Sequence, residues 1–405
     1  MSDVLPRLRL NLDFQPSPDP KRPGLFIRDP YHYCDATLLV PPPLVAALEC
    51  FDGAQTTLDL RSELVRITGE IQVGDLERHL YDSLNEAGFL ENETYTKLKA
   101  RREAEFAREP KREAIFAGSA YPANPAELSR LLEARIGACS GDAKIIGIAA
   151  PHASPDGGWE TYRAAYSSLP PKDGRERTFV ILGTSHYGAP DRFGLTRKQF
   201  VTPMGEARTD VGLVDELGRR ADGAIRIEDY CHAVEHSIEF QIVFLQHLYG
   251  ANVRILPILC GPFVKSIYEQ GMPEDNEHMA GFFEALGDIA ARESGRLFWV
   301  LGIDMAHMGR RYGDQLRATA NLGEMLAIEQ RDRQRIEQIN KGDIRGYWSL
   351  VQDGHDDLKW CGSSTLYTFM KALPGTRSDL LDYHQWQIDP QSVVSFAALR
   401  FRERE

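Results

Sequence analysis

The sequence has 405 residues, a length that predicts two or three domains at roughly 100–200 residues each. Hydrophobic residues make up 42% of the chain and charged residues 26%, which is the balance of a globular protein and excludes wholesale disorder. The formal net charge is −12, from 47 Lys and Arg against 59 Asp and Glu. A diffusely acidic protein repels the phosphate backbone, so we do not expect a nucleic-acid partner.

No apolar run reaches the roughly 18–20 residues that a membrane-spanning helix needs. The first residues, MSDVLPRLRL, lack the basic-then-apolar layout of a signal peptide. The six cysteines include no CxxC pair, and a chain of this length does not require a disulfide framework. We therefore expect a cytoplasmic protein with no membrane partner.

Residues 1–93 are expected to form a small α+β domain. LFIRD and ATLLV are typical of short strands. Three segments with apolar residues at helical spacing follow them: PPPLVAALECF, TTLDLRSELVRITG and GDLERHLYDSLNEAGFL. Two strands and three short helices indicate a winged-helix-type unit.

Residues 94–114 differ in kind from the segments on either side. Charges of both signs alternate, apolar residues are sparse, and Pro110 interrupts the run. Such a stretch is typical of a solvated helical linker, so we place a domain boundary here.

Residues 115–405 alternate strand-like and helical patterns. Four short runs are rich in Ile, Val and Leu without strict alternation, as in strands buried on both faces: 144–151, 178–183, 253–260 and 297–304. Helical segments lie between them: PAELSRLLEARI, VGLVDELGRRA, SIEFQIVFLQHLY and NEHMAGFFEALGDIAARE. The alternation predicts a layered α/β domain with a mainly parallel sheet.

Three of the four strands run into a histidine-bearing turn. The first ends at His152 and the second at His186, and the last supplies Asp304 and His307. Ligands collect at the carboxyl ends of the strands of an open α/β sheet, because the loops converge there. We therefore expect these side chains to share one edge of the sheet.

Two further clusters lie beside helices. CHAVEHSIEFQ contains His232, Glu235 and His236, and Ser237 is expected to cap the helix that follows. Cys361 lies just before another helical pattern, where the positive helix end favours the thiolate.

Each residue also has a purely structural interpretation. A histidine after a strand is more often a cap or core-edge residue, His232 and His236 could form a solvated face, and Cys361 could be a small buried hydrophobe. Together, five polar clusters at strand ends and helix starts favour a common cause. A metal site is that cause, because imidazole and thiolate are ligands that transition metals prefer.

At these residues the sequence resembles the Memo-like family, specifically its bacterial branch known as AmmeMemoRadiSam system protein B. The matching segments are AGSAYPANPAEL, APH, ILGTSHYG, VTPMGEARTD, EHSIEFQ, GIDMAHMG and WCGSS, and they occur in the family's order. The resemblance implies a fold like that of class III extradiol dioxygenases. Departures include PHASPDGGWETY, where the family commonly has PHAGYxYSG. Residues 1–93 resemble a PqqD-type winged helix, a fold that elsewhere binds leader peptides.

The resemblance implies that His152, His186 and Cys361 bind one metal ion. It places His236, Asp304 and His307 as catalytic residues in the same cavity, with His307 as the acid/base. The dioxygenases have a carboxylate where this chain has Cys361. The resemblance to the dioxygenases implies iron(II), whereas a thiolate makes a softer site and shifts the expectation toward copper or zinc. Iron(II) or copper is therefore expected, with zinc as a further alternative.

The leading expectation for function is a metal-dependent, dioxygenase-like oxidoreductase that acts on a small molecule or peptide. The family name implies an association with a radical-enzyme partner. Two alternatives remain: a non-catalytic copper-binding or redox partner protein, and a metal-dependent hydrolase in which His236 or His307 is the base.

Overall fold

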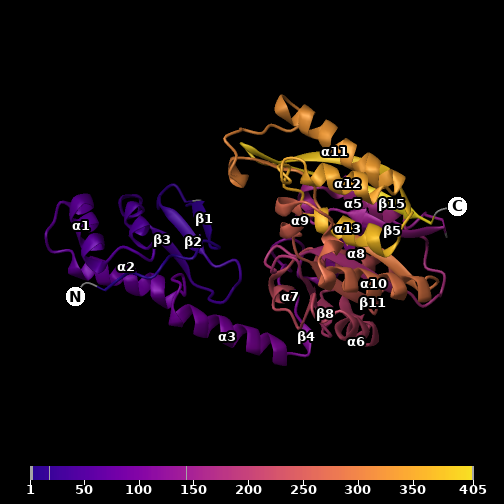
Figure 1. Ribbon diagram of the computed structural model, residues 1–405, viewed down its shortest axis with the longest axis horizontal. Helices are drawn as coiled ribbons and strands as arrows, with labels where there is room; N and C mark the ends of the chain where they lie inside the picture. The colour runs from indigo at the N-terminus through magenta and orange to yellow at the C-terminus, as the bar shows by residue number, and fades with distance from the viewer. Residues whose placement is uncertain (1–2, 18, 143, 404–405) are drawn as a thin grey trace. The chain divides into compact units, whose positions relative to one another are not determined.

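The computed structural model describes residues 3–17, 19–142 and 144–403. The chain divides into two compact units, one ending at Arg108 and the other beginning at Glu109. Figure 1 shows the helices and strands of each unit. No helix in the described ranges combines the length and the apolar character needed to cross a membrane.

The N-terminal unit combines a small antiparallel sheet with three α-helices. Its strands follow the order β1-β2-β3: β1 (Asp13–Pro16), β2 (Leu25–Arg28) and β3 (Thr37–Val40). Its helices are α1 (Thr57–Thr68), α2 (Gly74–Glu86) and α3 (Glu93–Arg108). Apolar side chains from both layers form one core, which includes Ile27, Leu60, Leu84 and Phe89. The small α+β unit matches the sequence prediction, whereas its assignment to the winged-helix type stays a prediction.

The segment PPPLVAALECF differs from its predicted helix. It forms two short 3₁₀ helices, Pro42–Leu44 and Ala46–Cys50, in place of one α-helix. The backbone N–H groups of Leu44 and Val45 bond to the carbonyls three residues back, at Pro41 and Pro42, which is the 3₁₀ pattern.

Most of the segment predicted to be a linker is helix α3. Phe106 is its buried residue, and its other side chains are exposed or half-buried. Within the same unit, the Arg9 guanidinium lies 4.2 Å from the centre of the Tyr95 ring, and Arg102 pairs with Asp35 at 2.6 Å. These contacts attach α3 to the N-terminal unit.

The C-terminal unit is built around one large mixed sheet, in which β4 (Lys111–Arg112) is an edge strand. The path runs β13-β15-β5-β12-β6-β11-β9-β8-β4. Four central neighbours are parallel: β5 (Ile145–Ala150), β12 (Leu297–Gly302), β6 (Thr178–Thr184) and β11 (Arg254–Cys260). These are the four predicted strands, so the predicted α/β fold with a mainly parallel sheet is confirmed.

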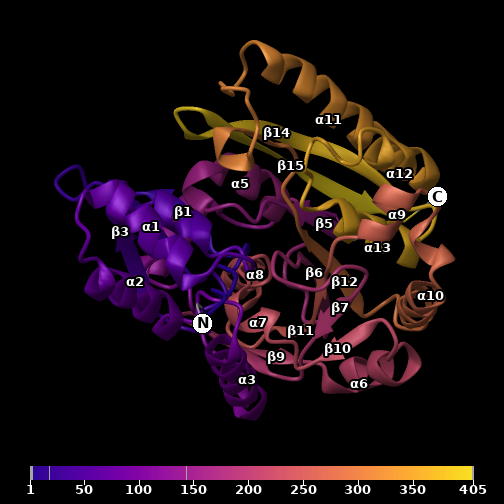
Figure 2. The same ribbon diagram turned by 60° about the vertical axis from the view of Figure 1, so that its left-hand side comes forward.

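Two apolar cores cover the two faces of this sheet. Side chains alternate along β6, so that Phe179 and Ile181 enter one core while Val180 and Leu182 enter the other. The first core receives α4 (Pro125–Arg135), α5 (Trp159–Ser167) and α8 (Glu239–Tyr249). The second receives α6 (Val211–Arg220), α10 (Glu277–Arg292), α11 (Glu324–Lys341), α12 (Ile344–Gln352) and α13 (Ser363–Ala372). Figure 2 shows the sheet between these helical layers.

Several elements of this unit lie outside the predicted set. A long antiparallel hairpin, β14 (Arg377–Asp389) and β15 (Ser392–Arg402), pairs with β5 through β15. The remaining strands and α-helices are β7 (Phe193–Leu195), β8 (Gln199–Thr202), β9 (Gly205–Thr209), β10 (Ile225–Ile227), β13 (His307–Gly309), α7 (Cys231–Val234) and α9 (Val264–Glu269).

Candidate metal centre

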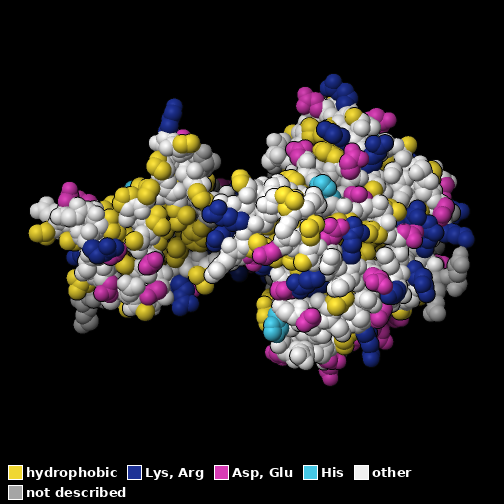
Figure 3. All heavy atoms as spheres, turned by 90° about the horizontal axis from the view of Figure 1, so that it is seen from above, with side chains coloured by type: hydrophobic (Ala, Val, Ile, Leu, Met, Phe, Trp, Pro, Cys, Tyr) yellow, Lys and Arg dark blue, Asp and Glu magenta, His cyan; other side chains and the backbone are white. Residues whose placement is uncertain are grey.

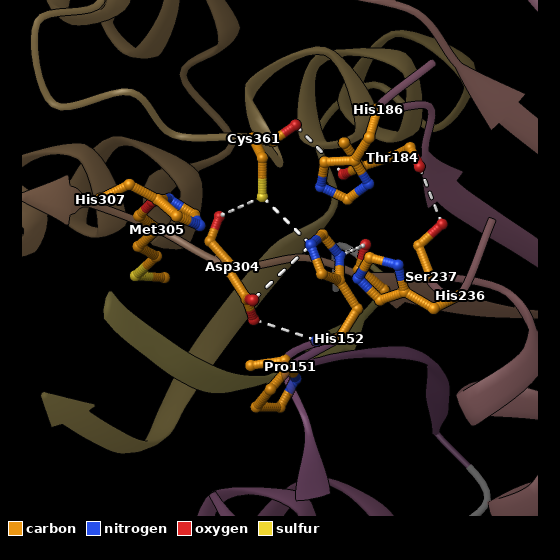
Figure 4. Close-up of polar contacts among 12 residues, drawn as sticks. Pro151, His152, Thr184, His186, His236, Ser237, Asp304, Met305, His307 and Cys361 are labelled. Carbon is orange, nitrogen blue, oxygen red and sulfur yellow. Dashed lines mark hydrogen bonds and ion pairs between the residues drawn. The ribbon is translucent and has the colours of Figure 1, made fainter. Parts of the chain in front are cut away.

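Three site residues leave neighbouring parallel strands at the same edge of the sheet. His152, Asp304 and His186 each lie two positions after the last residue of β5, β12 and β6, respectively. Gly302 at the end of β12 is in register with Ala150 of β5 and Gly183 of β6. The shared register therefore brings the three side chains together, as the sequence predicts (Figure 4).

His152 is buried, and its two ring nitrogens have different partners. Nδ1 lies 2.9 Å from the carbonyl oxygen of Gly302, to which it donates a proton as Nδ1–H. Nε2 lies 3.2 Å from Cys361 Sγ and 3.6 Å from Asp304 Oδ2. Burial by itself lowers the pKa of His152, but the Asp304 carboxylate and Cys361 outweigh burial and raise that pKa to about 9.

Cys361 immediately precedes Gly362, the residue that caps α13. Its carbonyl accepts a 3.1 Å hydrogen bond from Thr184 Oγ1, which ties the cysteine loop to the end of β6. Burial raises the pKa of the thiol, but the charge and hydrogen bond of His152 and a hydrogen bond from His186 outweigh it and lower the pKa to about 5. These opposite pKa shifts favour the thiolate–imidazolium form of the Cys361–His152 pair.

His186 is oriented by Glu235. Its Nδ1 lies 3.1 Å from both carboxylate oxygens of Glu235, and its backbone N–H donates to Oε2 at 2.9 Å. Burial lowers the pKa of His186, while the Glu235 carboxylate and Cys361 raise it, with a net upward direction. The Nε2 atom is thus the nitrogen of His186 that remains for a ligand.

His236 packs against both other imidazoles. Its ring stacks on His186 with centroids 4.9 Å apart and meets His152 edge-on at 5.2 Å. Its Nδ1 lies 3.2 Å from Glu235 Oε1. Burial lowers the pKa of His236 to about 3, so this imidazole is neutral.

His236 lies here because the neighbouring residue Ser237 packs closely against the ends of β12 and β6. A Cβ added to Gly302 would lie 2.4 Å from the Ser237 carbonyl oxygen, and one added to Gly183 would lie 2.6 Å from Ser237 Oγ. Ser237 Oγ donates to the Thr184 carbonyl at 2.8 Å. The predicted Ser237 cap is wrong, because α8 begins at Glu239 without a side-chain cap and the Ser237 hydroxyl serves β6.

Asp304 and His307 do not form the local pair that a D-x-x-H turn could make. The Asp304 carboxylate accepts from the backbone N–H of His152 at 3.0 Å. His307 Nδ1 lies 2.8 Å from the Met305 carbonyl and 3.1 Å from the Lys359 carbonyl. Backbone carbonyls therefore fix the His307 ring, which also lies perpendicular to the Tyr312 ring with centroids 5.0 Å apart.

Among the described residues, two groups of ligand atoms are close enough to surround one ion. One group is His152, His186 and His236, and the other is His152, Asp304 and Cys361; within each, the atoms lie within 4.8 Å of one another. His152 belongs to both groups. The predicted ligand set takes two histidines from the first group and the cysteine from the second.

Glu235 and Gln241 are the residues of this site to which the sequence assigned no role. Gln241 is fully buried, donates to the Pro151 carbonyl at 2.9 Å and accepts from Tyr166 at 2.6 Å. It therefore fixes the exit of β5 just before His152. Both residues lie within the EHSIEFQ motif, which was the available signal.

Comparisons with known proteins find related sequences that cover most of this chain. The sequence profile described as Memo-like protein matches residues 112–400. A "MEMO1 family protein" of Aquifex aeolicus is 27% identical over 98% of this chain and 99% of its own length. The "MEMO1 family protein TK1477" of Thermococcus kodakarensis is 30% identical over 71% of this chain and 97% of its own length.

The solved structure of the uncharacterized protein JW3007 from Escherichia coli K12 aligns with 63% of this chain and 99% of its own. Its identity is 12% and its TM-score 0.39, a likeness too distant to bear on function. The profile match spans more than half of the chain, including every candidate ligand. The chain therefore belongs to the Memo-like protein family.

Proposed function

We propose that the C-terminal unit binds one transition-metal ion through His152, His186 and Cys361 and acts as a metal-dependent oxidoreductase. The observation that carries the proposal is the contact of 3.2 Å between His152 Nε2 and Cys361 Sγ, a thiol whose pKa is lowered to about 5. The proton held between these two atoms is the one that a metal ion would replace.

The donor chemistry fits a single ion. His152 Nδ1 is committed to the Gly302 carbonyl, so one nitrogen remains and cannot bridge two metals. Imidazole nitrogen and thiolate sulfur suit iron, copper and zinc better than magnesium or calcium. Asp304 and His236 adjoin the same ligand atoms and complete the polar wall of the site.

His307 is suited to move a proton beside the ligands. Its Nδ1 donates to backbone carbonyls, which leaves Nε2 as the basic atom. His307 belongs to neither close ligand group. When bound, iron(II) would supply the redox chemistry, while the protein holds the substrate and accepts or returns the proton at His307 Nε2.

A copper-binding redox partner is the second candidate, and the thiolate favours it. A soft sulfur ligand selects copper(I) more strongly than the carboxylate that the dioxygenases have at this position. Competition between iron(II) and copper(I) for the metal-free protein distinguishes the two candidates.

Nitric oxide provides the test of the oxidoreductase proposal. This O₂ analogue would bind iron(II) if the protein ligands leave a coordination position open. Protein loaded anaerobically with iron(II) is expected to give the electron paramagnetic resonance signal of a high-spin iron–nitrosyl complex. Stoichiometric iron(II) binding without that signal would contradict the oxidoreductase proposal, and exclusive binding of copper(I) would favour the second candidate.

A further inference from the structure

Glu235 receives an unusual number of donors for one carboxylate. Its side chain is 1% exposed. Three backbone N–H groups donate to it: that of His186 to Oε2 at 2.9 Å, and those of His236 and Ser237 to Oε1 at 2.8 and 3.1 Å. The Nδ1 atoms of His186 and His236 lie 3.1 and 3.2 Å from its oxygens.

These contacts determine which nitrogen of each histidine carries a proton. Both carboxylate oxygens accept from backbone donors, and an ionised carboxylate has no proton to give. An imidazole Nδ1 facing such an oxygen is therefore favoured as the N–H form, and its Nε2 lone pair is directed elsewhere. Figure 4 shows the rings of His186 and His236 beside the ring of His152.

We infer that Glu235 is a positioning residue that fixes His186 and His236 together as Nδ1–H tautomers and so presents both Nε2 atoms to the metal centre. The tautomers follow from the hydrogen bonds of Glu235 alone. That they serve to present Nε2 atoms to a metal ion rests on the proposed function. His236 thereby takes the same orientation as a ligand histidine. The Gly302 carbonyl fixes the tautomer of His152 in the same way, because it accepts a hydrogen bond from His152 Nδ1–H.

The buried side chain of Arg112 fixes the backbone on which Glu235 lies. Arg112 Nη2 donates to the Glu235 carbonyl at 2.7 Å, and Arg112 Nε donates to the His232 carbonyl at 2.9 Å. Arg112 also pairs with Glu239, whose carboxylate accepts from the Phe116 backbone at 3.1 Å. The turn that carries Glu235 is thus fixed at both of its ends, as a rigid positioning group requires.

Glu235→Gln separates tautomer control from simple filling of space. The amide has nearly the shape of the carboxylate but places an NH₂ donor where one oxygen stood. The amide oxygen is best placed at Oε1, which accepts two backbone donors, so the NH₂ group would face His186. His186 Nδ1 should then accept, and its Nε2 should carry the proton.

The test uses long-range ¹H–¹⁵N correlation spectra of ¹⁵N-histidine-labelled, metal-free protein, followed by zinc titration. The wild type should keep a proton on Nδ1 of His186 and His236 at every pH at which it is folded. Glu235→Gln should convert His186 to the neutral Nε2–H tautomer and weaken zinc binding by about 10–100-fold. Assignments come from the spectra of His186→Ala and His236→Ala.

Glu274→Gln is the matched control, because Glu274 is a paired carboxylate of the same unit that bonds to Tyr367 and Lys371 and not to the histidine rings or to Arg112. It should lower the thermal midpoint yet keep both tautomers and zinc affinity within about tenfold. A neutral Nε2–H tautomer of either histidine in the wild type would overturn the inference without any variant. A wild type that shows the expected tautomers but binds no metal would instead refute the proposed function.

Discussion

His152 shows how one side chain can be both fixed and reactive. Its Nδ1 is tied to the carbonyl of Gly302, while its Nε2 faces the Cys361 sulfur at 3.2 Å. When one ring nitrogen donates to the protein, the tautomer and the ring orientation are fixed, and the other nitrogen is free to face a metal ion. At the residue scale, each candidate ligand histidine is therefore oriented by the partner of its other ring nitrogen.

Replacing His307 by alanine should separate proton transfer from metal binding. His307 lies outside both close ligand groups, so metal affinity should stay within about tenfold of wild type, whereas redox turnover should be lost. Metal titration of His307→Ala beside His152→Ala measures the first part. A collapse of affinity in His307→Ala would show that His307 is itself a ligand.

His232 predicts a pH dependence of stability in the metal-free protein. Burial lowers its folded pKa to about 4, against the opposing charge of Asp229, while the unfolded pKa is about 6.5. The unfolded chain therefore binds a proton between these values that the folded chain does not. Stability is fully present above about pH 6.5 and should fall by about 3 kcal/mol as the pH decreases to 4.

Urea unfolding of the wild type and His232→Gln at several pH values between about 4.5 and 7.5 tests this dependence. Glutamine can retain the donor to the Gly194 carbonyl, which lies 3.0 Å from His232 Nε2. The difference at pH 7.5 measures the change in packing alone. If the free energies of unfolding of the two proteins differ by the same amount at every pH tested, His232 contributes nothing to the pH dependence.

The sequence predicts the ligand candidates better than the groups that orient them. His152, His186 and Cys361 are uncommon residue types beside recognisable strands and helices. Glu235 is one of 59 acidic residues, and most of its partners are backbone N–H groups or ring nitrogens brought close by folding. Its role therefore depends on tertiary geometry that spacing along the chain does not show.

At the scale of elements, the end of β12 and the start of α8 must approach closely. Gly302 and Gly183 lie side by side on β12 and β6, and Ser237 packs over both. The glycines are required here by space, and not by a left-handed backbone. Their lack of side chains allows the loop carrying Glu235 and His236 to rest on the sheet edge.

Gly302→Ala is expected to destabilise the C-terminal unit by about 1–3 kcal/mol, because the new methyl group would overlap the Ser237 carbonyl and the Gln241 amide. Gly281→Ala is the control: nothing lies within 4 Å of its Cβ, and alanine in a helix interior should add up to about 1 kcal/mol. Urea denaturation measures both. Equal stability of the two variants would contradict the close packing at Gly302.

Predictability differs among elements for physical reasons. The central strands are recognisable because burial on both faces demands continuous apolar runs. The sequence prediction omits the β14–β15 hairpin: β14 is mostly half-buried and carries charged residues among apolar ones, whereas β15 is almost fully buried and contains an apolar run of the recognisable kind. Apolar spacing also does not distinguish the two 3₁₀ helices after β3 from one α-helix, because both kinds of helix bury residues three positions apart.

At the scale of the whole molecule, charge is dispersed, and the candidate ligand groups found among the described residues lie in the C-terminal unit. Lys, Arg, Asp and Glu side chains are intermingled over the visible face of the C-terminal unit, with no basic stripe on that face (Figure 3). Hydrophobic side chains are prominent on the visible face of the N-terminal unit, whose exposed residues include Leu10 and Phe14.

Because the chain divides into two compact units at Arg108 and Glu109, we expect the two units to be separable in solution.

Limited trypsin digestion should first cut the intact chain near residues 94–114. Residues 107–110 are exposed, and α3 buries Phe106 among mostly exposed or half-buried side chains. Mass spectrometry of the early fragments identifies the site. First cleavage within 145–310 would contradict the proposed division into domains.

Metal stoichiometry in single variants tests the central claim most directly. Protein purified without a histidine tag, made metal-free and reloaded anaerobically, should bind one ion per chain by elemental analysis. His152→Ala, His186→Ala and Cys361→Ala should each lose most of that ion, whereas Cys50→Ala, a buried cysteine of the N-terminal unit, should retain it. Undiminished binding in all three ligand variants would contradict the account.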